Sequence, residues 1–267
     1  MKILVIDLEG ISLDWFLADD KLENIRQLIE ISGFGALPDS QLSGLRAAVA
    51  SQPGELHMWD LLAEIEKKSI LISKSSQSMN PGPMKSWIGI PYEIRAADDC
   101  IVSCQSLFSL ARQVVLGQHW DYLQIIEDFR ICRGLIPAIS ESAFRDYLRA
   151  LDQEIGLLLQ VLTDEVILLV FFQASSDGED LVPAESQVQS RFILASANNP
   201  LLGDLGNVSR DEIVPTLFEL AGFSVHTQFA ASSLIASRAA EILARNDLAP
   251  DEAEIIRERL SGLGYIG

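Results

Sequence analysis

Two apolar segments of this sequence end on carboxylic acids, and these acids are its first candidates for chemistry. The opening stretch MKILVIDLEG passes from an apolar run into Asp7, with Glu9 and Gly10 directly after it. The stretch DYLQIIED ends in the same way, on Asp128. A carboxylate at the end of a buried strand either has a function or is simply solvated at the edge of the sheet. One with a function can bind a hard cation such as Mg²⁺ or Ca²⁺. Open α/β sheets bind ligands at that same edge, so a small anion or a partner could dock there too.

The cysteines and histidines are few and scattered. Cys100 and Cys104 in CIVSC are interpreted as small core residues, and an odd set of three cysteines is typical of a reducing cytoplasm. The three histidines, His57, His119 and His226, share no motif, so we interpret each as a surface or structural histidine.

Hydrophobic patterning predicts the elements that would position these residues. Apolar runs alternate with longer stretches of helical period, which is typical of an α/β fold with a mainly parallel central sheet and helices on both faces. Strands are predicted over 2–7, 69–73, 121–128, 165–172 and 190–196. Helices are predicted over 20–32, 57–68, 141–162, 210–223 and 251–267. No linker rich in Pro, Gly or Ser divides the chain, so 1–267 is predicted to be a single domain, with helix 251–267 packed on it or on a partner.

Composition excludes some partners. Lys and Arg number 20 against 38 Asp and Glu, a net charge of −18, which repels nucleic acid and anionic lipid. The longest apolar run, 166–172, has seven residues, whereas a membrane span needs about 18. Asp7 and Glu9 interrupt any apolar region of a secretory signal. We therefore expect a cytoplasmic protein that binds neither nucleic acid nor membrane.

Five segments carry a family resemblance. In chain order they are ILVIDLEG, MWDLLAEIEKKSILIS, YLRALDQEIGLLLQVLTDEVILLV, DEIVPTLFELAGF and IRERLSGLGYIG. Their order and spacing resemble the alkaline phosphatase superfamily, specifically its type I phosphodiesterase and nucleotide pyrophosphatase branch. The resemblance implies an alkaline phosphatase-like fold. It also implies a site where two metal ions, usually zinc, activate a Thr or Ser nucleophile and bind a phosphoester at the ends of the parallel strands.

When the family's metal ligands are matched one by one to this sequence, only some of them have a counterpart. Asp7 corresponds to the first metal-binding Asp, and Asp128 in EDFRIC to a second retained carboxylate. Cys132 stands where a ligand His belongs, and a thiolate can also bind zinc.

The family's Ser-Asp-His-Gly motif after the central strand is incomplete. A direct alignment places Phe172 and Gln173 at its Asp and His, whereas a slipped alignment keeps Asp177 of SSDG but still lacks the His. We interpret Phe172 as a core residue, because the apolar run continues through it. The family's last His has no counterpart between 190 and 216.

The nucleophile position is open between two serines. In GALPDSQLSGLRAAVASQPGE, Ser40 and Ser43 are the candidates. Helix N-capping alone would explain Ser40, and the neighbouring Asp39 would repel a phosphate.

The ligand count favours a non-catalytic protein. With two of about six ligands clearly in place, the shell that would hold two mutually repelling cations is missing. We therefore predict a degenerate phosphodiesterase-like protein, without a cofactor, that has lost two-metal hydrolysis and binds a small ligand or a protein partner. The alternative is a phosphoester hydrolase with a rearranged or single-metal site of Asp7, Asp128, Cys132 and Asp177, using Zn²⁺, Mn²⁺ or Mg²⁺.

The tail offers a further kind of partner. The apolar residues Leu263, Tyr265 and Ile266 could cover a second copy of the chain, or could pack on the chain's own core. A homo-oligomer is therefore compatible with the sequence.

Overall fold

Unbroken apolar runs build the centre of the fold, because strands covered by helices on both faces have no polar side. β1 (Lys2–Glu9) and β8 (Val166–Gln173) are such runs, and their side chains are buried except at the strand ends. The structure is a computed structural model that describes residues 1–37, 46–48, 55–74, 86–90, 93–117, 119–136, 139–173, 190–197, 199–224 and 229–244.

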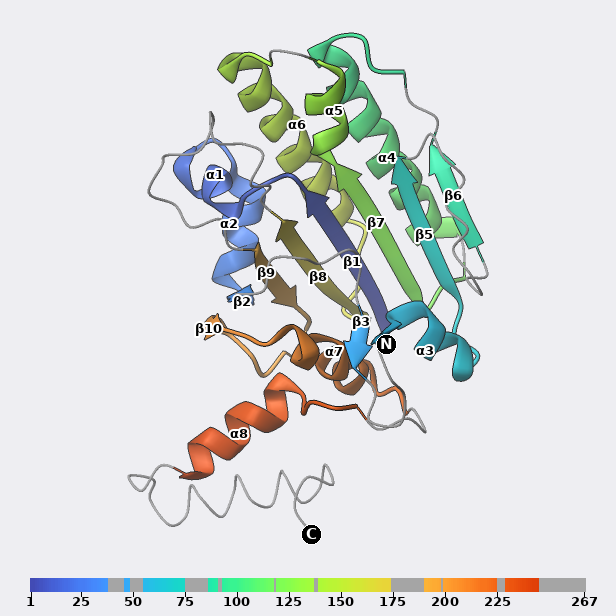
Figure 1. Cartoon of the computed structure of the whole chain (residues 1–267), viewed down its shortest axis with the longest axis vertical. Helices are drawn as coiled ribbons and strands as arrows, with labels where there is room; N and C mark the ends of the chain where they lie inside the picture. The colour runs from blue at the N-terminus through green and yellow to red at the C-terminus, as the bar shows by residue number, and fades with distance from the viewer. Residues whose placement is uncertain are drawn as a thin grey trace.

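Within the described residues, the main sheet has eight strands and is almost wholly parallel (Figure 1). Its spatial order is β10 (Gly203–Asn207), β2 (Gly33–Leu37), β9 (Ser190–Ala195), β8, β1, β7 (Tyr122–Asp128), β5 (Ser69–Lys74) and β6 (Ser86–Ile90). Only β9 runs against the other strands of this sheet. β3 (Arg46–Ala48) and β4 (Glu55–His57) form a separate antiparallel pair. The carboxyl ends of β1, β7 and β8 therefore meet at one edge.

Helices cover both faces of the sheet. One face packs against α1 (Leu13–Ala18), α2 (Glu23–Glu30), α4 (Ala97–Gly117), α5 (Phe129–Leu135) and α6 (Glu141–Leu159). The other face packs against α3 (Met58–Glu64) and α7 (Ile213–Ala221), which the 3₁₀ helix η2 (Arg210–Glu212) precedes and α8 (Leu234–Ala244) follows. The predicted α/β architecture, a mainly parallel sheet between two helical layers, is confirmed.

Several elements do not follow from the hydrophobic pattern. The predicted helices over 20–32, 57–68, 141–162 and 210–223 are present, with ends trimmed by a few residues. The hydrophobic pattern did not predict α4, a helix of 21 residues, or β2, which reads GFGAL. β6, β10 and α8 were also not predicted, and the predicted helix over 251–267 lies outside the described residues.

Among the described residues, α4 is the one helix long and apolar enough to span a membrane by length and composition. Core helices of soluble proteins pass the same test. In this structure Cys104, Leu107 and Phe108 of α4 are fully buried in the core on the sheet face shared with α6.

A buried ion pair lies beneath α4, α5 and α6 at the carboxyl end of the sheet. The Lys74 ammonium on β5 donates to Glu127 on β7, and both side chains are fully buried. The Tyr147 hydroxyl of α6 donates to the same Glu127 oxygen at 2.7 Å. Burial alone would lower the pKa of Lys74, but the Glu127 carboxylate more than compensates and holds this pKa above its usual value.

This pair predicts a large asymmetry between single and double substitutions. Lys74→Met leaves a buried carboxylate without its cation and should cost about 3–5 kcal/mol of unfolding free energy. Lys74→Met with Glu127→Gln removes both charges and keeps an acceptor for Tyr147, so most of that loss should be recovered. Urea denaturation of the single and double variants measures both values, and additive losses would contradict this account.

Candidate functional site

Strand register places three polar residues side by side at the carboxyl edge. Glu9, the last residue of β1, pairs with Asp128 of β7 on one side and with Gln173 of β8 on the other. Because neighbours in register on parallel strands point to the same face, all three side chains lie on the face covered by α3 and α7. Asp7, two residues earlier on β1, shares that face.

Arg130 supplies the positive charge at this edge. Asp128 caps α5, accepting from the Arg130 backbone N–H at 3.0 Å. The Arg130 guanidinium donates two hydrogen bonds to Asp128, from Nε to Oδ1 at 2.8 Å and from Nη2 to Oδ2 at 2.9 Å. Its Nη2 also donates to the Glu9 carboxylate. One guanidinium therefore bridges the ends of β1 and β7.

Gly10 makes room for this arginine. Its φ of +76° lies in the left-handed region, and a Cβ there would come within 2.8 Å of Arg130 Cγ. Its N–H also donates to the Gln173 carbonyl at 2.7 Å, which ties the end of β1 to β8. The turn after DLEG is thus shaped to hold the Arg130 side chain.

Asp7 is held from the other side by Gln173. The Gln173 side-chain amide donates to Asp7 Oδ1, and Asp7 is only 1% exposed. Burial, reinforced by the Glu9 charge, raises the pKa of Asp7 well above its ordinary value. Burial and the nearby Asp128 likewise raise the pKa of Glu9 from 4.5 to about 7, against the opposing effect of Arg130.

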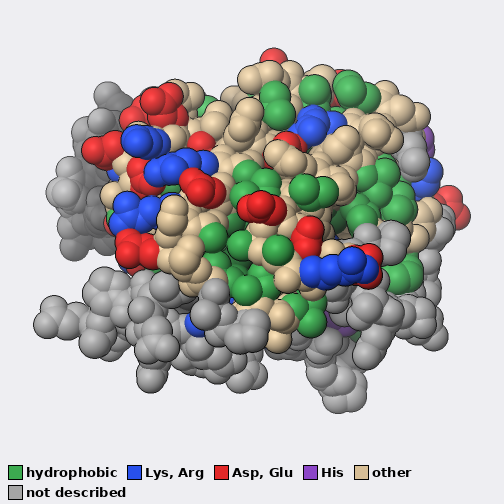
Figure 2. All heavy atoms as spheres, turned by 90° about the horizontal axis from the view of Figure 1, so that it is seen from above, with side chains coloured by type: hydrophobic (Ala, Val, Ile, Leu, Met, Phe, Trp, Pro, Cys, Tyr) green, Lys and Arg blue, Asp and Glu red, His purple; other side chains and the backbone are tan. Residues whose placement is uncertain are grey.

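The surroundings of this edge are partly apolar. Figure 2 looks onto the end of the molecule toward which β1, β5 and β7 point, and hydrophobic side chains gather there around acidic ones. Leu135, the last residue of α5, is 53% exposed, and Trp15 of α1 is only partly buried.

The structure brings some of the predicted site residues together. Asp7 and Asp128 lie on neighbouring strands at one edge, as expected from the sequence. Cys132 is fully buried in α5, in the core on the opposite face, and forms a side-chain hydrogen bond with Cys100. Ser40, Ser43 and Asp177 lie outside the described residues.

Phe172 is a core residue, as predicted. It is 1% exposed, faces away from Asp7 and packs edge-on against Phe16 at 5.7 Å. Gln173, which a direct alignment places at the family's His, is the residue that contacts Asp7.

Neither described histidine reaches this edge. His57 stacks on Trp59 at 4.1 Å, and His119 precedes β7 at the amino end of the sheet.

Sequence reasoning missed the residue that organises the site. Arg130 was given no role, although its position two residues after Asp128 in EDFR, at a strand-to-helix junction, was a usable signal. Glu9 was noted without a role, although the period of two along a strand places it on the same face as Asp7.

The described residues do not fit a two-metal centre. The Arg130 guanidinium already forms ion pairs with Glu9 and Asp128. The Asp7 Oδ1 atom accepts a hydrogen bond from the Gln173 side-chain N–H, a group that cannot serve as a metal ligand. Zinc sites are built from clustered imidazole, thiolate and carboxylate donors. Within the described ranges, no three His, Cys, Asp or Glu side chains are grouped in that way.

Comparison with known proteins identifies the fold. No family model and no curated protein sequence matches this chain. The lipoteichoic acid synthase LtaP from Listeria monocytogenes superposes with a TM-score of 0.57 at 12% identity, over 88% of this chain and 75% of that one. A protein in the alkaline phosphatase superfamily from Vibrio parahaemolyticus gives 0.58 at 13% identity, over 83% of this chain and 66% of that one.

A third structure of this fold is the murine ectonucleotide pyrophosphatase/phosphodiesterase 5, with a TM-score of 0.52 at 7% identity, over 84% of this chain and 96% of that one. The chain therefore has the alkaline phosphatase superfamily fold, and the resemblance seen in the sequence is confirmed for the fold. At these identities the likeness establishes the fold alone.

The raised pKa of Glu9 predicts a pH effect on stability. Between about pH 4.5 and 7 the folded state holds a proton on Glu9 that the unfolded chain releases, so stability falls as pH rises through this window. The shift corresponds to about 3 kcal/mol at most. Glu9→Gln cannot ionise and should lack this loss, so it should gain stability relative to the native protein between pH 5 and pH 8.

Urea denaturation at both pH values measures this difference. Glu141→Gln, which changes an exposed carboxyl on α6, serves as the control and should follow the native protein. Equal pH dependence of Glu9→Gln and the native protein would contradict the assigned role of Glu9.

Proposed function

We propose that this chain is a non-catalytic protein of the alkaline phosphatase fold that acts by binding a small ligand or a protein partner at the carboxyl edge of its sheet. One observation carries the proposal: the Arg130 guanidinium bridges Glu9 and Asp128, where the fold family would use carboxylates to hold metal ions. The guanidinium of Arg130 cannot coordinate and activate a nucleophile as a metal ion does.

Electrostatics supports the loss of hydrolysis. Two divalent ions bring four positive charges to a phosphoester, whereas Arg130 brings one and is already shared between two carboxylates. The chain carries a net charge of −18, and the one arginine at this edge is already shared between two carboxylates, so the edge offers little attraction for an anionic phosphoester.

The same features indicate what would bind instead. Acidic groups at the centre of the edge and apolar side chains around it suit a neutral or cationic ligand, or a protein surface with an exposed basic residue. The cytoplasmic location inferred from the sequence remains part of this proposal, and it agrees with three free cysteines.

A direct test separates this proposal from the metal-dependent alternative. The purified full chain should bind no stoichiometric metal and should not hydrolyse 4-nitrophenyl phosphate or bis(4-nitrophenyl) phosphate with Zn²⁺, Mn²⁺ or Mg²⁺. Metal analysis and absorbance assays measure both. Stoichiometric metal, with turnover that Asp7→Ala and Asp128→Ala abolish, would overturn the proposal in favour of a hydrolase.

A second test addresses Arg130 itself. Arg130→Ala leaves Glu9 and Asp128 facing each other without a cation, and should cost about 1–2 kcal/mol, because the half-exposed arginine is screened by solvent. Millimolar Mg²⁺, a hard cation that prefers oxygen ligands, should then raise the melting temperature of Arg130→Ala but not of the native protein.

Arg145→Ala is the matched control, because it removes an arginine from an exposed ion pair with Glu141 on α6. Its melting temperature should be unchanged within error and should not respond to Mg²⁺. A native protein that Mg²⁺ stabilises as strongly as Arg130→Ala would show that Arg130 does not take the place of a metal.

A further inference from the structure

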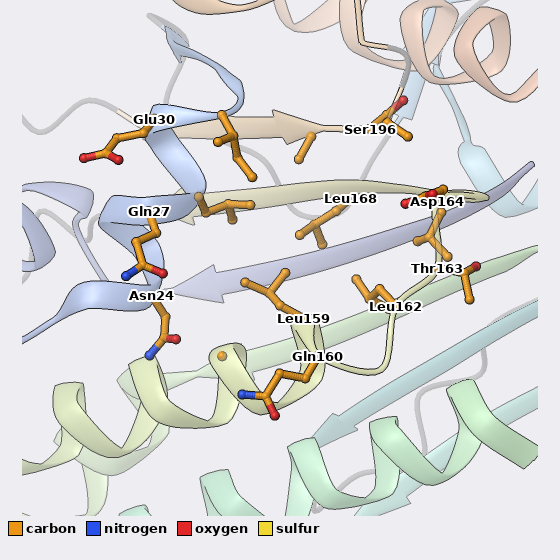
Figure 3. A pocket seen from close by; sticks show the side chains of 16 residues that line it. Asn24, Gln27, Glu30, Leu159, Gln160, Leu162, Thr163, Asp164, Leu168 and Ser196 are labelled. Carbon is orange, nitrogen blue, oxygen red and sulfur yellow. The ribbon is translucent and has the colours of Figure 1, made fainter.

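A cavity lies on the sheet face that carries α2 and α6, away from the carboxyl edge. It has a volume of about 760 Å³ and is bordered by α2, by the end of α6 and by the first half of β8 (Figure 3). Small-molecule sites in proteins commonly fall between about 300 and 1,000 Å³. The cavity is therefore large enough for a ligand with a ring.

The two helices that form its walls are fixed to each other at one end. Asp152 of α6 caps the start of α2, accepting from the Ile25 N–H at 3.0 Å and from the Asn24 side-chain amide at 2.9 Å. Gly156 permits this close approach, since a Cβ there would lie 2.2 Å from Asn24 Oδ1. Beyond this contact both helices end, at Glu30 and Leu159, and the first half of β8 is left as the floor. The cavity is thus preformed by the packing of α2 on α6.

The floor and inner walls of the cavity are apolar. Val166 and Leu168 of β8 form the floor with Leu28 of α2, and each of these is less than 10% exposed. In Figure 3, Leu159, Leu162 and Leu168 lie between Gln27 and Glu30 on one side and Asp164 on the other.

The electrostatics of the rim favour a cation. The carboxyl ends of both α2 and α6 border the cavity, and such ends carry about half a negative charge each. Neither helix has a basic residue in its last turn. Among the described residues that line the cavity, the charged ones are Glu30 and Asp164, and none is Lys or Arg.

We propose that this cavity binds a small organic cation, an ammonium group carried on an apolar body that contains a ring. The body lies on Leu28, Val166 and Leu168, and the ammonium group lies at the rim near Asp164 and the end of α6. The inference is independent of the function proposed for the carboxyl edge, because it uses none of the residues of that edge.

Three probe molecules that share a phenyl-alkyl group and differ in the charge of their terminal group test the proposal. 4-Phenylbutylamine, 4-phenylbutan-1-ol and 4-phenylbutyrate are titrated separately into the full-length protein, with binding followed by calorimetry and by ligand-observed NMR. The amine should bind with a millimolar or lower dissociation constant, the alcohol about fivefold more weakly and the carboxylate not measurably. Equal binding of amine and carboxylate, or no binding of the amine, would overturn the proposal.

Variants then locate the binding site. Asp164→Lys reverses an exposed rim charge and should weaken amine binding about tenfold. Asp146→Lys is the matched control, because Asp146 is an exposed acid on α6 about 20 Å along the helix from Gln160 and should leave binding unchanged. Ala195→Phe places a ring in the cavity and should abolish binding of both the amine and the alcohol.

Other occupants would be recognised in the same experiments. Circular dichroism and melting curves establish that each variant is folded. A concentration-dependent dimer in size-exclusion chromatography with light scattering that Ala195→Phe disrupts would assign the cavity to a second copy of the chain and overturn the proposal. Unchanged amine binding in Asp164→Lys and Ala195→Phe would place the amine elsewhere and overturn it as well.

Discussion

The contact of Arg130 with Glu9 and Asp128 makes the rest of the carboxyl edge possible. Parallel neighbouring strands lie about 4.8 Å apart, so register alone brings these two carboxylates close together. At roughly 5 Å and an effective dielectric of about 20, two such charges repel each other by about 3 kcal/mol. A shared guanidinium removes most of this repulsion with bonds of fixed geometry. The carboxylates of this edge are therefore compensated from within the chain, because Arg130 is the second residue of α5 and lies beside the N-cap Asp128.

On the other face of the sheet, this edge has a second carboxylate that is paired with a basic side chain. Glu127 and Asp128 are consecutive in β7 and so point to opposite faces of the sheet. Glu127 pairs with Lys74 in the core, and Asp128 pairs with Arg130 near solvent. The two pairs differ in their energetics, because the buried pair is costly to break and the half-exposed pair is screened. Together they fix the end of β7 to β5 on one face and to β1 on the other.

The sequence predicted the architecture better than the site. Central strands and the helix over 141–162 were identified because long periodic or unbroken apolar patterns are strong local signals. α4 was missed because its apolar residues are spread around the helix rather than gathered on one face, as the exposed Val102 and Leu116 show. The site residues Asp7 and Asp128 were found because each ends an apolar run. The contact of Arg130 with Asp128 is local and could have been predicted, whereas its contact with Glu9 depends on strand register, which only the folded chain provides.

On our proposal, Arg130 takes the place of the metal ions of the fold family, and this changes which ligands the carboxyl edge favours. A two-metal centre makes the carboxyl edge attractive to anions, and this is why the fold suits phosphoesters. Here the charge of Arg130 is shared by Glu9 and Asp128, and the raised pKa values of Asp7 and Glu9 keep part of the edge protonated near neutral pH, whereas the chain as a whole carries a net charge of −18. Because long-range attraction follows the sign of the surface charge, we expect cationic partners to approach this protein most readily. The geometry of the fold is thus retained, and on our proposal its preference for ligand charge is set by the side chains of one strand-to-helix junction.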